Sequence, residues 1–330
     1  MYNMILIDNI LSNIPAYNLA LEEALLRRKN DHNAYLLIYI DNPSVVIGRH
    51  QNIYEEVNLK YCYDNNIPVL RRISGGGAVW HDSGNLNFSF ITDKSAKLVN
   101  NYQPFLQPLV SALKEIGVNA VQNEQNDLTL NEKKICGTAQ FTTRERMLTH
   151  GTLLFKADLQ KARSALSTPL HSFYYSKSKK SRISPIANIA DYIVQPLDMK
   201  GFKQRLISIL QKNNIIKSIE IVNDNVKSAA QKLMDERYEQ WMWNYGRSPD
   251  SQFERKLILK YGEIAITAKI VRGIFKELSI KSDFIEKSKI KRIENLFKEQ
   301  KNDILYIKKI NNEIKKLHIE NIDWITLLYE

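Results

Sequence analysis

The sequence predicts an α+β protein with a large N-terminal domain and a smaller C-terminal domain. A chain of 330 residues is long enough for about two domains of roughly 150 residues each. Strand-like and helical segments are interspersed through the first 190 residues, and a second group of strands and helices follows residue 250. Between them, 241–249 holds three aromatic residues, a glycine and a proline, which is typical of a boundary. We therefore expect domains at 1–248 and 249–330.

The elements of the large domain follow from hydrophobic spacing. A helix is expected at 18–28, where leucines and alanines recur at three- and four-residue spacings and Glu22 and Glu23 face outward. A second helix is expected at 57–65. Segment 86–91 alternates apolar and polar residues, which predicts a strand buried on one face. The expected strands are 34–40, 44–47, 68–72, 86–91, 128–130, 134–140 and 150–155.

The pattern changes in the second half of the chain. Helical periodicity over 199–210 and 225–239 completes the large domain. After the boundary, 255–279 contains two or three strands, and 287–300 and 311–329 have the spacing of amphipathic helices. The last 80 residues are therefore expected to form a small α+β domain.

The composition and charge of the chain narrow the classes of function that it can have. Lys and Arg number 47 against 36 Asp and Glu, and the net charge of +11 favours an acidic partner without identifying it. No zinc finger or RNA-binding aromatic pattern accompanies the charge, so we expect no nucleic acid partner. The longest wholly apolar run, 34–40, is far shorter than the about 20 residues of a membrane span, so no membrane is expected. No leader pattern precedes Arg27, and Cys62 and Cys136 lack metal-ligand spacing, so we expect a cytoplasmic protein with reduced thiols.

Glycine is scarce in the chain, yet four of its twelve glycines lie in one segment, RRISGGGAVWHDSGNLNFSF, residues 71–90. Three consecutive glycines after a strand let backbone N–H groups approach an anionic or bulky ligand with no Cβ in the way. For a glycine triplet alone, a tight hairpin turn is the alternative. Polar side chains flank this triplet on both sides: Arg71, Arg72 and Ser74 before it, and His81, Asp82 and Asn85 after it. This density of polar groups favours a ligand site.

The segment closely resembles the signature of the lipoate-protein ligases, in which it lines the pocket for lipoate and lipoyl-adenylate. Other segments are similar to further blocks of that family in the same order: 18–23, 47–52, 126–128, 134–139, 150–154 and 241–246. The resemblance covers about residues 1–250, and beyond them it is one of position and length. It implies a large mixed-sheet catalytic domain of the biotin and lipoate ligase type, followed by a small accessory domain.

The resemblance implies an ATP-dependent lipoate-protein ligase. Such an enzyme activates lipoate to lipoyl-AMP, releases pyrophosphate and transfers the lipoyl group to a lysine of a carrier domain. ATP with Mg²⁺ would be the co-substrate, with no permanently bound cofactor. The implied partners are the lipoyl carrier domains of 2-oxoacid dehydrogenase acyltransferase subunits and the glycine cleavage H protein.

The resemblance also assigns site residues. Lys134 matches the family lysine at the reacting carboxylate and α-phosphate, where a compact ammonium suits the charge that develops at phosphorus. Asp127 is the expected Mg²⁺ ligand, with an Asx turn as the alternative. The residues expected to bind lipoate or the adenylate are Arg71, Arg72, Ser74, Gly75, Gly76, Gly77, Ala78, His81, Asn85, Asn126, Asp127, Gly137, Thr138, Ala139, His150, Gly151 and Thr152.

Some assignments stay open at this stage. His81 either orients the ligand or fixes the conformation of the glycine loop. Ser181, Arg182 and Asn188 loosely match a family loop that folds over the nucleotide. Cys136 stands where other members have a small residue, and we expect it to pack in the core. No cysteine follows it, whereas related octanoyl transferases of one type carry an acyl-bearing cysteine further along, so adenylate chemistry is favoured.

Two alternative functions remain. A lipoyltransferase that uses a preformed lipoyl-nucleotide shares much of the pattern. A non-catalytic carrier-binding protein would explain the basic charge, but not the combination of the glycine triplet with Asp127 and Lys134.

Overall fold

The computed structural model describes residues 3–8, 12–166, 174–182, 184–317 and 322–329. Its main sheet is built from β1 (Met4–Asp8), β2 (Tyr35–Tyr39), β6 (Asn85–Asp93), β7 (Val121–Gln122), β8 (Leu128–Leu130), β9 (Lys133–Thr142), β10 (Arg146–Leu154) and β12 (Ile216–Glu220). The strand order is β12-β1-β2-β6-β10-β9-β8-β7. Strands β12, β1 and β2 run parallel and the later pairs antiparallel, which confirms the expected mixed sheet.

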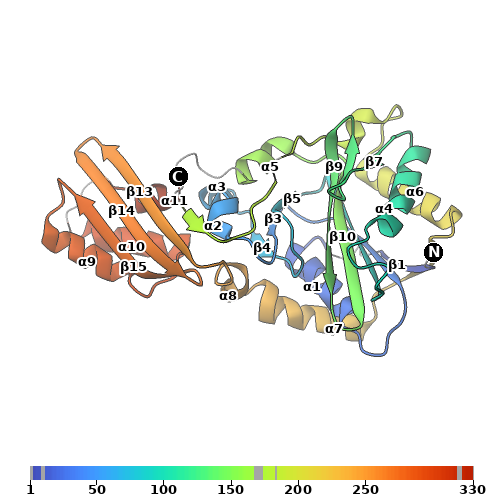
Figure 1. Ribbon diagram of the computed structural model, residues 1–330, viewed down its shortest axis with the longest axis horizontal. Coiled ribbons are helices and arrows are strands. Elements are labelled where there is room, and N and C mark those ends of the chain that lie inside the picture. The colour runs from blue at the N-terminus through green and yellow to red at the C-terminus, as the bar shows by residue number, and fades with distance from the viewer. Residues whose placement is uncertain (1–2, 9–11, 167–173, 183, 318–321, 330) are drawn as a thin grey trace.

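Helices cover both faces of the main sheet (Figure 1). One face packs against α1 and α7, and the other against α4 and α6. The expected half-buried strand at 86–91 is therefore wrong: the alternate polar residues Asn87 and Ser89 of β6 are buried as well. The helices are α1 (Pro15–Leu26), α4 (Gln103–Glu115), α6 (Met199–Lys212) and α7 (Asp224–Leu233).

A small sheet with the order β4-β3-β5 lies beside the main sheet and carries the glycine triplet between two of its strands. The helix expected at 57–65 is confirmed as α3, which begins after its cap Asn58, and a separate short helix, α2, capped by Asn52, precedes the expected range. The elements of this region are β3 (Ser44–Ile47), α2 (Ile53–Glu56), α3 (Leu59–Asp64), β4 (Val69–Arg71), β5 (Val79–His81) and α5 (Leu159–Leu166).

The C-terminal region contains β13 (Ser251–Leu259), β14 (Gly262–Val271), β15 (Ile274–Ser282), α9 (Lys287–Phe297), α10 (Ile304–Lys315) and α11 (Trp324–Tyr329). Its three antiparallel strands and their helices confirm the predicted α+β unit within the described residues. The single helix expected at 311–329 is wrong, because α10 ends at Lys315 and α11 begins at Trp324. Part of the expected helix, 318–321, lies outside the described residues.

The C-terminal region and the small sheet share one core (Figure 1). Trp80 of β5 and Tyr54 of α2 belong to the same buried cluster as Phe253 and Phe275. In addition, β11 (Tyr174–Ser176) precedes residue 248 in the chain but pairs with β13 at the edge of the C-terminal sheet. The boundary at 248/249 stays a prediction. The structure adds that β11, which precedes the boundary in the chain, belongs to the C-terminal sheet.

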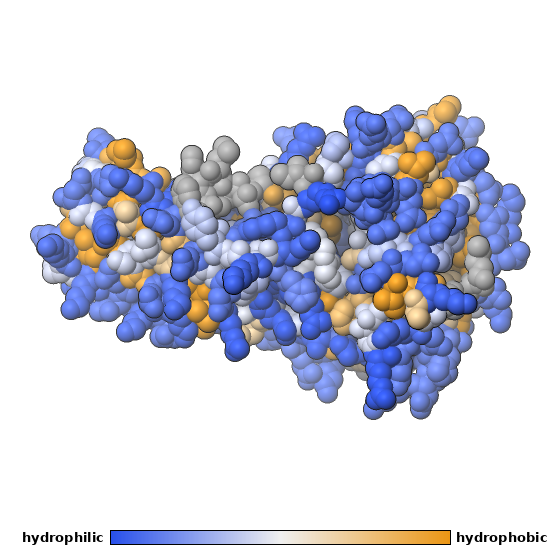
Figure 2. Space-filling view, viewed as in Figure 1, coloured by the Kyte–Doolittle hydropathy of each residue, from blue (hydrophilic) through white to orange (hydrophobic). Residues whose placement is uncertain are grey.

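Shorter helical turns connect these elements: a 3-10 turn (Ile189–Tyr192), a π-helical turn (Met234–Tyr238) and α8 (Trp241–Asn244). Hydrophilic side chains dominate the face seen in Figure 2, with apolar groups scattered between them. Within the described residues, none of the helices combines the length and the apolar character needed to cross a bilayer.

Candidate active site

Hydrogen bonds from Arg72 hold the glycine loop, residues 73–78, in place. The Arg72 guanidinium donates from Nη2 to the carbonyl oxygens of Gly75 (2.6 Å) and Gly77 (2.8 Å) and from Nη1 to that of Val46 (3.0 Å). Burial lowers the pKa of Arg72 to about 10, so the group is still charged at neutral pH. A charged donor that spans the loop fixes its shape before any ligand arrives.

Two glycines in this region cannot carry a side chain. Gly76 has a φ of 94°, in the left-handed region that L-residues rarely adopt, and a Cβ on it would lie 2.7 Å from Nη2 of Arg72. A Cβ on Gly48 would lie 2.1 Å from the carbonyl oxygen of Gly76. Within the triplet, Gly76 is therefore required by its backbone conformation, and Gly48 is required by its close approach to Gly76, whereas Gly75 has room for a Cβ.

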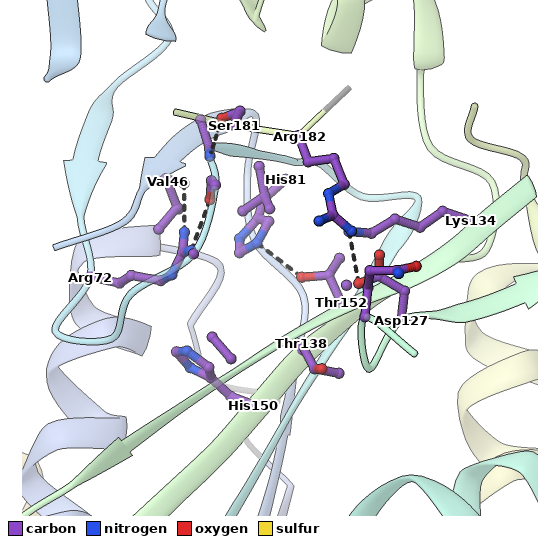
Figure 3. A pocket seen from close by; sticks show the side chains of 18 of the residues that line it. Val46, Arg72, His81, Asp127, Lys134, Thr138, His150, Thr152, Ser181 and Arg182 are labelled. Atoms are coloured by element: carbon purple, nitrogen blue, oxygen red, sulfur yellow. Dashed lines mark hydrogen bonds and ion pairs between the residues drawn. The ribbon is translucent and has the colours of Figure 1, made fainter. Parts of the chain in front are cut away.

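A cavity of about 800 Å³ opens between the glycine loop and the inner surface of β9 and β10 (Figure 3). Its mouth is crossed by the strap, which we define as residues 174–182. The predicted site residues that line the cavity are Arg72, Gly76, Gly77, Ala78, His81, Asp127, Lys134, Gly137, Thr138, Ala139, His150, Gly151 and Thr152.

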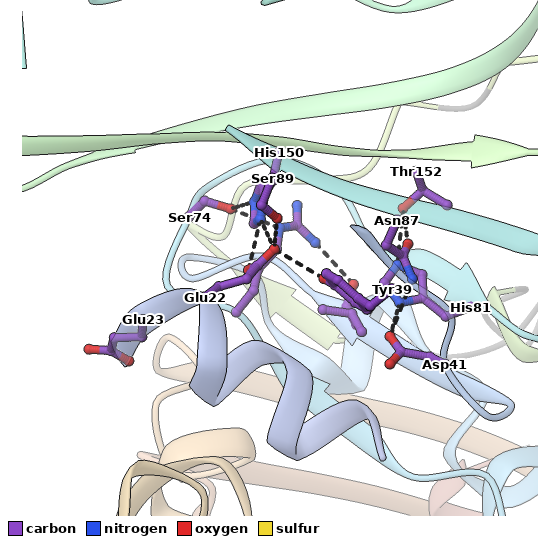
Figure 4. A network of polar contacts seen from close by, with 12 residues as sticks. Glu22, Glu23, Tyr39, Asp41, Ser74, His81, Asn87, Ser89, His150 and Thr152 are labelled. Atoms are coloured by element: carbon purple, nitrogen blue, oxygen red, sulfur yellow. Dashed lines mark hydrogen bonds and ion pairs between the residues drawn. The ribbon is translucent and has the colours of Figure 1, made fainter. Parts of the chain in front are cut away.

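Deep in the wall, the buried carboxylate of Glu22 on α1 organises one group of polar side chains (Figure 4). Tyr39 Oη donates to Glu22 (3.0 Å), Ser89 donates through its hydroxyl, and His150 Nδ1 lies 3.1 Å from Glu22 Oε2. The other ring nitrogen of His150 is 2.7 Å from Ser74 Oγ. His150 is thus held at both nitrogens and presents its ring to the cavity.

Asp41 organises a second group in the same way (Figure 4). His81 Nδ1 lies 2.8 Å from Asp41 Oδ2, and His81 Nε2 lies 3.1 Å from Thr152 Oγ1. Asn18 donates to the other oxygen of Asp41 at 2.7 Å. These hydrogen bonds of His81 do not involve the glycine loop, so of the two roles considered for it, orienting a ligand fits the geometry better.

Replacing Glu22 with Gln should destabilise the fold at neutral pH. Burial acts to raise the pKa of Glu22, but the charge and hydrogen bond of His150, with hydrogen bonds from Ser89 and Tyr39, outweigh it and lower the pKa. Loss of a hydrogen bond to a buried charged group costs about 1.5–3 kcal/mol, and three side chains bond to this carboxylate. Urea unfolding at pH 7 measures this loss against Glu239→Gln, a change at an exposed position that should be nearly silent.

The pH dependence gives the Glu22→Gln prediction a second test. A carboxyl group with a lowered pKa adds stability above its unfolded pKa of about 4.3, and that stability is lost as the pH falls through the folded pKa. The gap between Glu22→Gln and the parent chain should therefore shrink on acidification below about pH 4. A gap that is absent at pH 7, or that widens in acid, would contradict an ionised, hydrogen-bonded carboxylate at Glu22.

Lys134 lies at the mouth of the cavity, at the start of β9. Its backbone is fixed by pairing with the segment that follows the strap, through the Pro185 carbonyl (2.8 Å) and the Ala187 N–H (3.0 Å). Its side chain passes over Gly137, where a Cβ would lie 2.8 Å from Lys134 Cε. The ammonium reaches Asp127 Oδ1 at 2.9 Å. Gly137 therefore makes the room that directs Lys134 toward Asp127.

Asp127 is aimed into the cavity by a turn made by its neighbours. Asn126 has a φ of 63°, and the Asn123 side chain accepts the Asp127 N–H at 2.9 Å. The Asx turn considered for Asp127 is thus made by Asn123, which leaves the Asp127 carboxylate to the cavity. One carboxylate suits Mg²⁺ when phosphate oxygens supply further ligands, and no cluster of three metal-binding side chains occurs in the described part of the chain.

The strap closes the mouth over the glycine loop. Ser181 Oγ accepts from the Ala78 N–H (2.9 Å) and from Gln51 Nε2 (3.0 Å), and the Ser181 N–H donates to the Glu56 carboxylate. Arg182 lines the cavity next to Lys134 (Figure 3). The third loosely matched residue, Asn188, instead bonds the backbone of Ala157 outside the lining.

Five predicted site residues do not line the cavity: Arg71, Ser74, Gly75, Asn85 and Asn126. Three of them hold neighbouring groups in place. Ser74 bridges Arg72 and His150, Asn85 bonds within the turn before β6, and Asn126 forms the turn that places Asp127. Cys136 is fully buried and, as expected, packs in the core, where burial raises its thiol pKa to about 12.

The sequence analysis missed three buried carboxylates, Glu22, Glu23 and Asp41, and several residues that line the cavity. Glu22 and Glu23 were expected to face outward, but both are buried, because α1 lies between the sheet and α7 and has no free face at these positions. Asp41 looked like part of a polar turn. The further lining residues are Leu19, Tyr39, Val46, Val79, Glu124, Gln125, Lys179 and Lys180. For the lysines, the basic run at 177–182 was the available signal.

The chemistry available in the cavity is that of binding and charge stabilisation. A polar buried end and a backbone-lined middle lead to a mouth that carries Lys134, Lys179, Lys180 and Arg182 beside Asp127 and Glu124. Such an arrangement can hold an elongated molecule with its reacting anionic group at the mouth.

Comparisons with known proteins agree with this arrangement. Residues 14–211 match the family model "Lipoyl protein ligase A/B catalytic domain", and residues 248–328 match "Bacterial lipoate protein ligase C-terminus". Lipoate--protein ligase 1 of Staphylococcus aureus is 36% identical over 304 residues, which cover 92% of each chain.

Solved structures show the same likeness. A crystal structure of lipoate-protein ligase A bound with ATP matches with a TM-score of 0.63 and 27% identity, over 75% of this chain and 100% of that chain. A putative lipoate protein ligase from Thermoplasma acidophilum with bound lipoic acid matches with a TM-score of 0.63 and 26% identity, over 74% and 100%. A second T. acidophilum structure, described as a bi-partite lipoate protein ligase and its E2 lipoyl domain, matches equally well at 0.63 and 26%, over 75% and 97%.

These matches extend over both halves of the chain, and the cavity lies inside the part that the catalytic model covers. The alignment with the staphylococcal ligase runs through the glycine loop, the Lys134 strand and most of the C-terminal unit. The chain therefore belongs to the lipoate-protein ligase family and is an enzyme of that family.

Proposed function

We propose that this enzyme activates lipoate with ATP to lipoyl-AMP, releases pyrophosphate, and transfers the lipoyl group to a lysine of a lipoyl carrier domain. The observation that carries the proposal is the position of Lys134, whose ammonium lies at the cavity mouth beside the glycine loop and 2.9 Å from Asp127. An ammonium placed there stabilises the charge shared by a carboxylate and the α-phosphate during adenylation. The relatives solved with lipoic acid and with ATP support both substrates.

The other residues of the cavity bind different parts of the substrates, according to where they lie. The acyl chain of lipoate lies along the inner part of the cavity, against Gly151 and the rings of His81 and His150. The backbone N–H groups of the glycine loop face the adenylate, and Arg182 of the strap neutralises phosphate charge at the mouth. Mg²⁺, held by Asp127 and phosphate oxygens, would supply further neutralisation of negative charge when bound.

The alternative is a lipoyltransferase that accepts only a preformed lipoyl-nucleotide. Mass spectrometry of an acceptor lipoyl domain separates the two functions. A ligase modifies the domain when given free lipoate, ATP and Mg²⁺. A transferase modifies it only when given lipoyl-AMP, and that outcome would overturn the activation step. If the acceptor domain is modified with neither mixture, both the ligase and the transferase are overturned, and a non-catalytic carrier-binding protein is favoured.

We further propose the acyltransferase subunits of 2-oxoacid dehydrogenases and the glycine cleavage H protein as carriers, and the cytoplasm as the location. The T. acidophilum ligase described with its E2 lipoyl domain supports the first class of carrier. The strap brings Lys179, Lys180 and Arg182 to the mouth where the carrier lysine must enter. A basic entrance on a chain of net charge +11 favours carriers with an acidic surface.

Salt should therefore weaken transfer to the carrier more than transfer to an uncharged acceptor. Steering of an acidic carrier toward a basic entrance acts over a Debye length of about 8 Å at 0.15 M salt and about 3 Å at 1 M. We expect kcat/KM for the carrier to fall with ionic strength while the rate of transfer to a small neutral amine, measured with the same supplied lipoyl-AMP, changes little. Equal salt dependence for both acceptors would rule out steering of the carrier.

A further inference from the structure

Arg71 is a buried charge without a carboxylate partner. It is fully buried, and its guanidinium donates to neutral oxygens, among them the carbonyls of Gln51 (2.7 Å) and Asn244 (2.9 Å) and the hydroxyl of Ser248 (3.1 Å). Within the described residues, no carboxylate is paired with it. Burial lowers the pKa of Arg71 to about 10, and the neighbouring charge of Arg247 adds to the effect. The group stays charged at neutral pH, so the region carries uncompensated positive charge.

A second cavity, of about 840 Å³, opens beside this charge, where the large domain meets the C-terminal sheet. Ser248 lines the cavity and its hydroxyl also accepts from Arg71, so this residue links the buried guanidinium to the cavity lining. The residues that line it are Glu236, Arg237, Gln240, Met242, Trp243, Gly246, Arg247, Ser248, Asp250 and Arg272.

Aromatic stacking orders two of the three lining arginines. The guanidinium carbons of Arg237 and Arg247 lie 4.8 Å and 4.9 Å from the centroid of the Trp243 ring. Arg237 is also paired with Glu23, whereas Arg247 has no ion-pair partner in the described part of the chain. Stacking on an indole holds a guanidinium in place and leaves its N–H edge free for an oxyanion. Arg247 is thus oriented without being neutralised.

The third arginine comes from the C-terminal unit. Arg272 lies in the turn between β14 and β15 with a φ of 50°, and its N–H donates to Asp250 Oδ1 at 3.2 Å. That contact fixes the backbone of Arg272, while its side chain forms no ion pair among the described residues. Arginines from both sides of the junction therefore face one cavity, and Arg71 adds a further charge behind it.

We propose that this cavity is an anion-binding site of the phosphate class, in which Arg247 and Arg272 hold the oxyanion and Arg71 supplies charge from behind Ser248. Guanidinium groups match phosphate oxygens with paired hydrogen bonds, and an anion here would compensate positive charge that the lining carboxylates Glu236 and Asp250 balance only in part. The volume accepts a single phosphate or a linked pair of phosphates. The site is separate from the cavity of Lys134, with which it shares no lining residue.

Calorimetric titration of the full chain with inorganic phosphate, at an ionic strength kept constant with chloride, tests the proposal. Because phosphate could also enter the first cavity, the titration is repeated in Lys134→Ala. We expect Lys134→Ala to retain phosphate binding, and Arg247→Gln and Arg272→Gln each to weaken it about tenfold or more, as loss of a charge-assisted hydrogen bond does. Titration of the same variants with diphosphate distinguishes a site for a single phosphate from a site for two linked phosphates.

Two further variants complete the test. Arg247→Lys keeps the charge but loses the planar fork and its stacking, so it should bind phosphate more weakly than the parent chain and more tightly than Arg247→Gln. Lys256→Gln, at an exposed position of β13 outside the cavity, should bind like the parent chain. The proposal is overturned by absent binding to the parent chain, by unchanged affinity in both arginine-to-glutamine variants, or by a loss confined to Lys134→Ala.

Discussion

Lys134→Ala should fold normally, still bind lipoate, and lose about 10²- to 10³-fold in lipoate-dependent ATP–pyrophosphate exchange, or roughly 3 to 4 kcal/mol of transition-state stabilisation. The ammonium lies at the cavity mouth and pairs with Asp127, where it meets the charge that develops at the α-phosphate. An interaction that strengthens in the transition state lowers kcat when it is removed, rather than only raising KM. The partly exposed Lys134–Asp127 pair contributes little to stability, about 1 kcal/mol or less.

Lys133 provides the matched control for this prediction. The two lysines are adjacent on β9, and side chains alternate along a strand, so Lys134 enters the cavity while Lys133 is exposed. Lys133→Ala should be nearly silent in steady-state kinetics of exchange. A loss of less than about tenfold in Lys134→Ala, well below the effect of removing such a donor, would contradict the role given to this lysine.

Gly76→Val should give the second large effect, a loss of affinity for both lipoate and lipoyl-AMP. Gly76 has a φ of 94°, and a Cβ there would lie 2.7 Å from Nη2 of Arg72. A β-branched residue in this conformation costs about 1–3 kcal/mol, and the contact forces Arg72 away from the carbonyls that it holds. Calorimetry with each ligand should show affinity reduced about tenfold or more, since 1.4 kcal/mol is a factor of ten.

The neighbouring glycine gives the control for Gly76→Val. A Cβ on Gly75 meets nothing within 4 Å, and Gly75 does not have a left-handed φ. Gly75→Ala should therefore bind both ligands nearly as the parent chain does. Unchanged lipoyl-AMP affinity in a folded Gly76→Val protein would reduce the triplet to an ordinary turn, because the strain at Gly76 would then have no effect on the site.

The sequence predicted the parts of the site that depend on local chemistry. Gly76 could be found because a glycine triplet among polar residues is a pattern within one segment, whereas Lys134 was assigned from the resemblance to the lipoate-protein ligases. The mixed sheet and the C-terminal α+β unit followed from the family resemblance and from hydrophobic spacing. The exact ends of helices did not, because side-chain caps set them: Asn58 makes α3 begin at Leu59, two residues after the expected start at 57.

The parts that depend on tertiary contacts could not be predicted. Glu22 lies in a helical pattern that places it outward, and only the packing of α1 between β6, β10 and α7 buries it against His150. Arg71 fits the signature as well as Arg72 does. In the fold, however, Arg71 turns toward α8, and the carbonyls of Gln51 and Asn244 surround it. Side-chain direction at adjacent positions is decided by partners far away in the sequence.

Lipoate-dependent exchange of labelled pyrophosphate into ATP is the most direct test of the central claim, which is that this enzyme itself forms lipoyl-AMP. The reaction requires only the chain, Mg²⁺, ATP, labelled pyrophosphate and lipoate, so no carrier or donor preparation can mask the result. We expect label in ATP when lipoate is present, almost none when it is omitted, and a loss of about 10²-fold or more in Lys134→Ala. Exchange that does not depend on lipoate, or that is absent while supplied lipoyl-AMP is still transferred to a carrier, would contradict the claim.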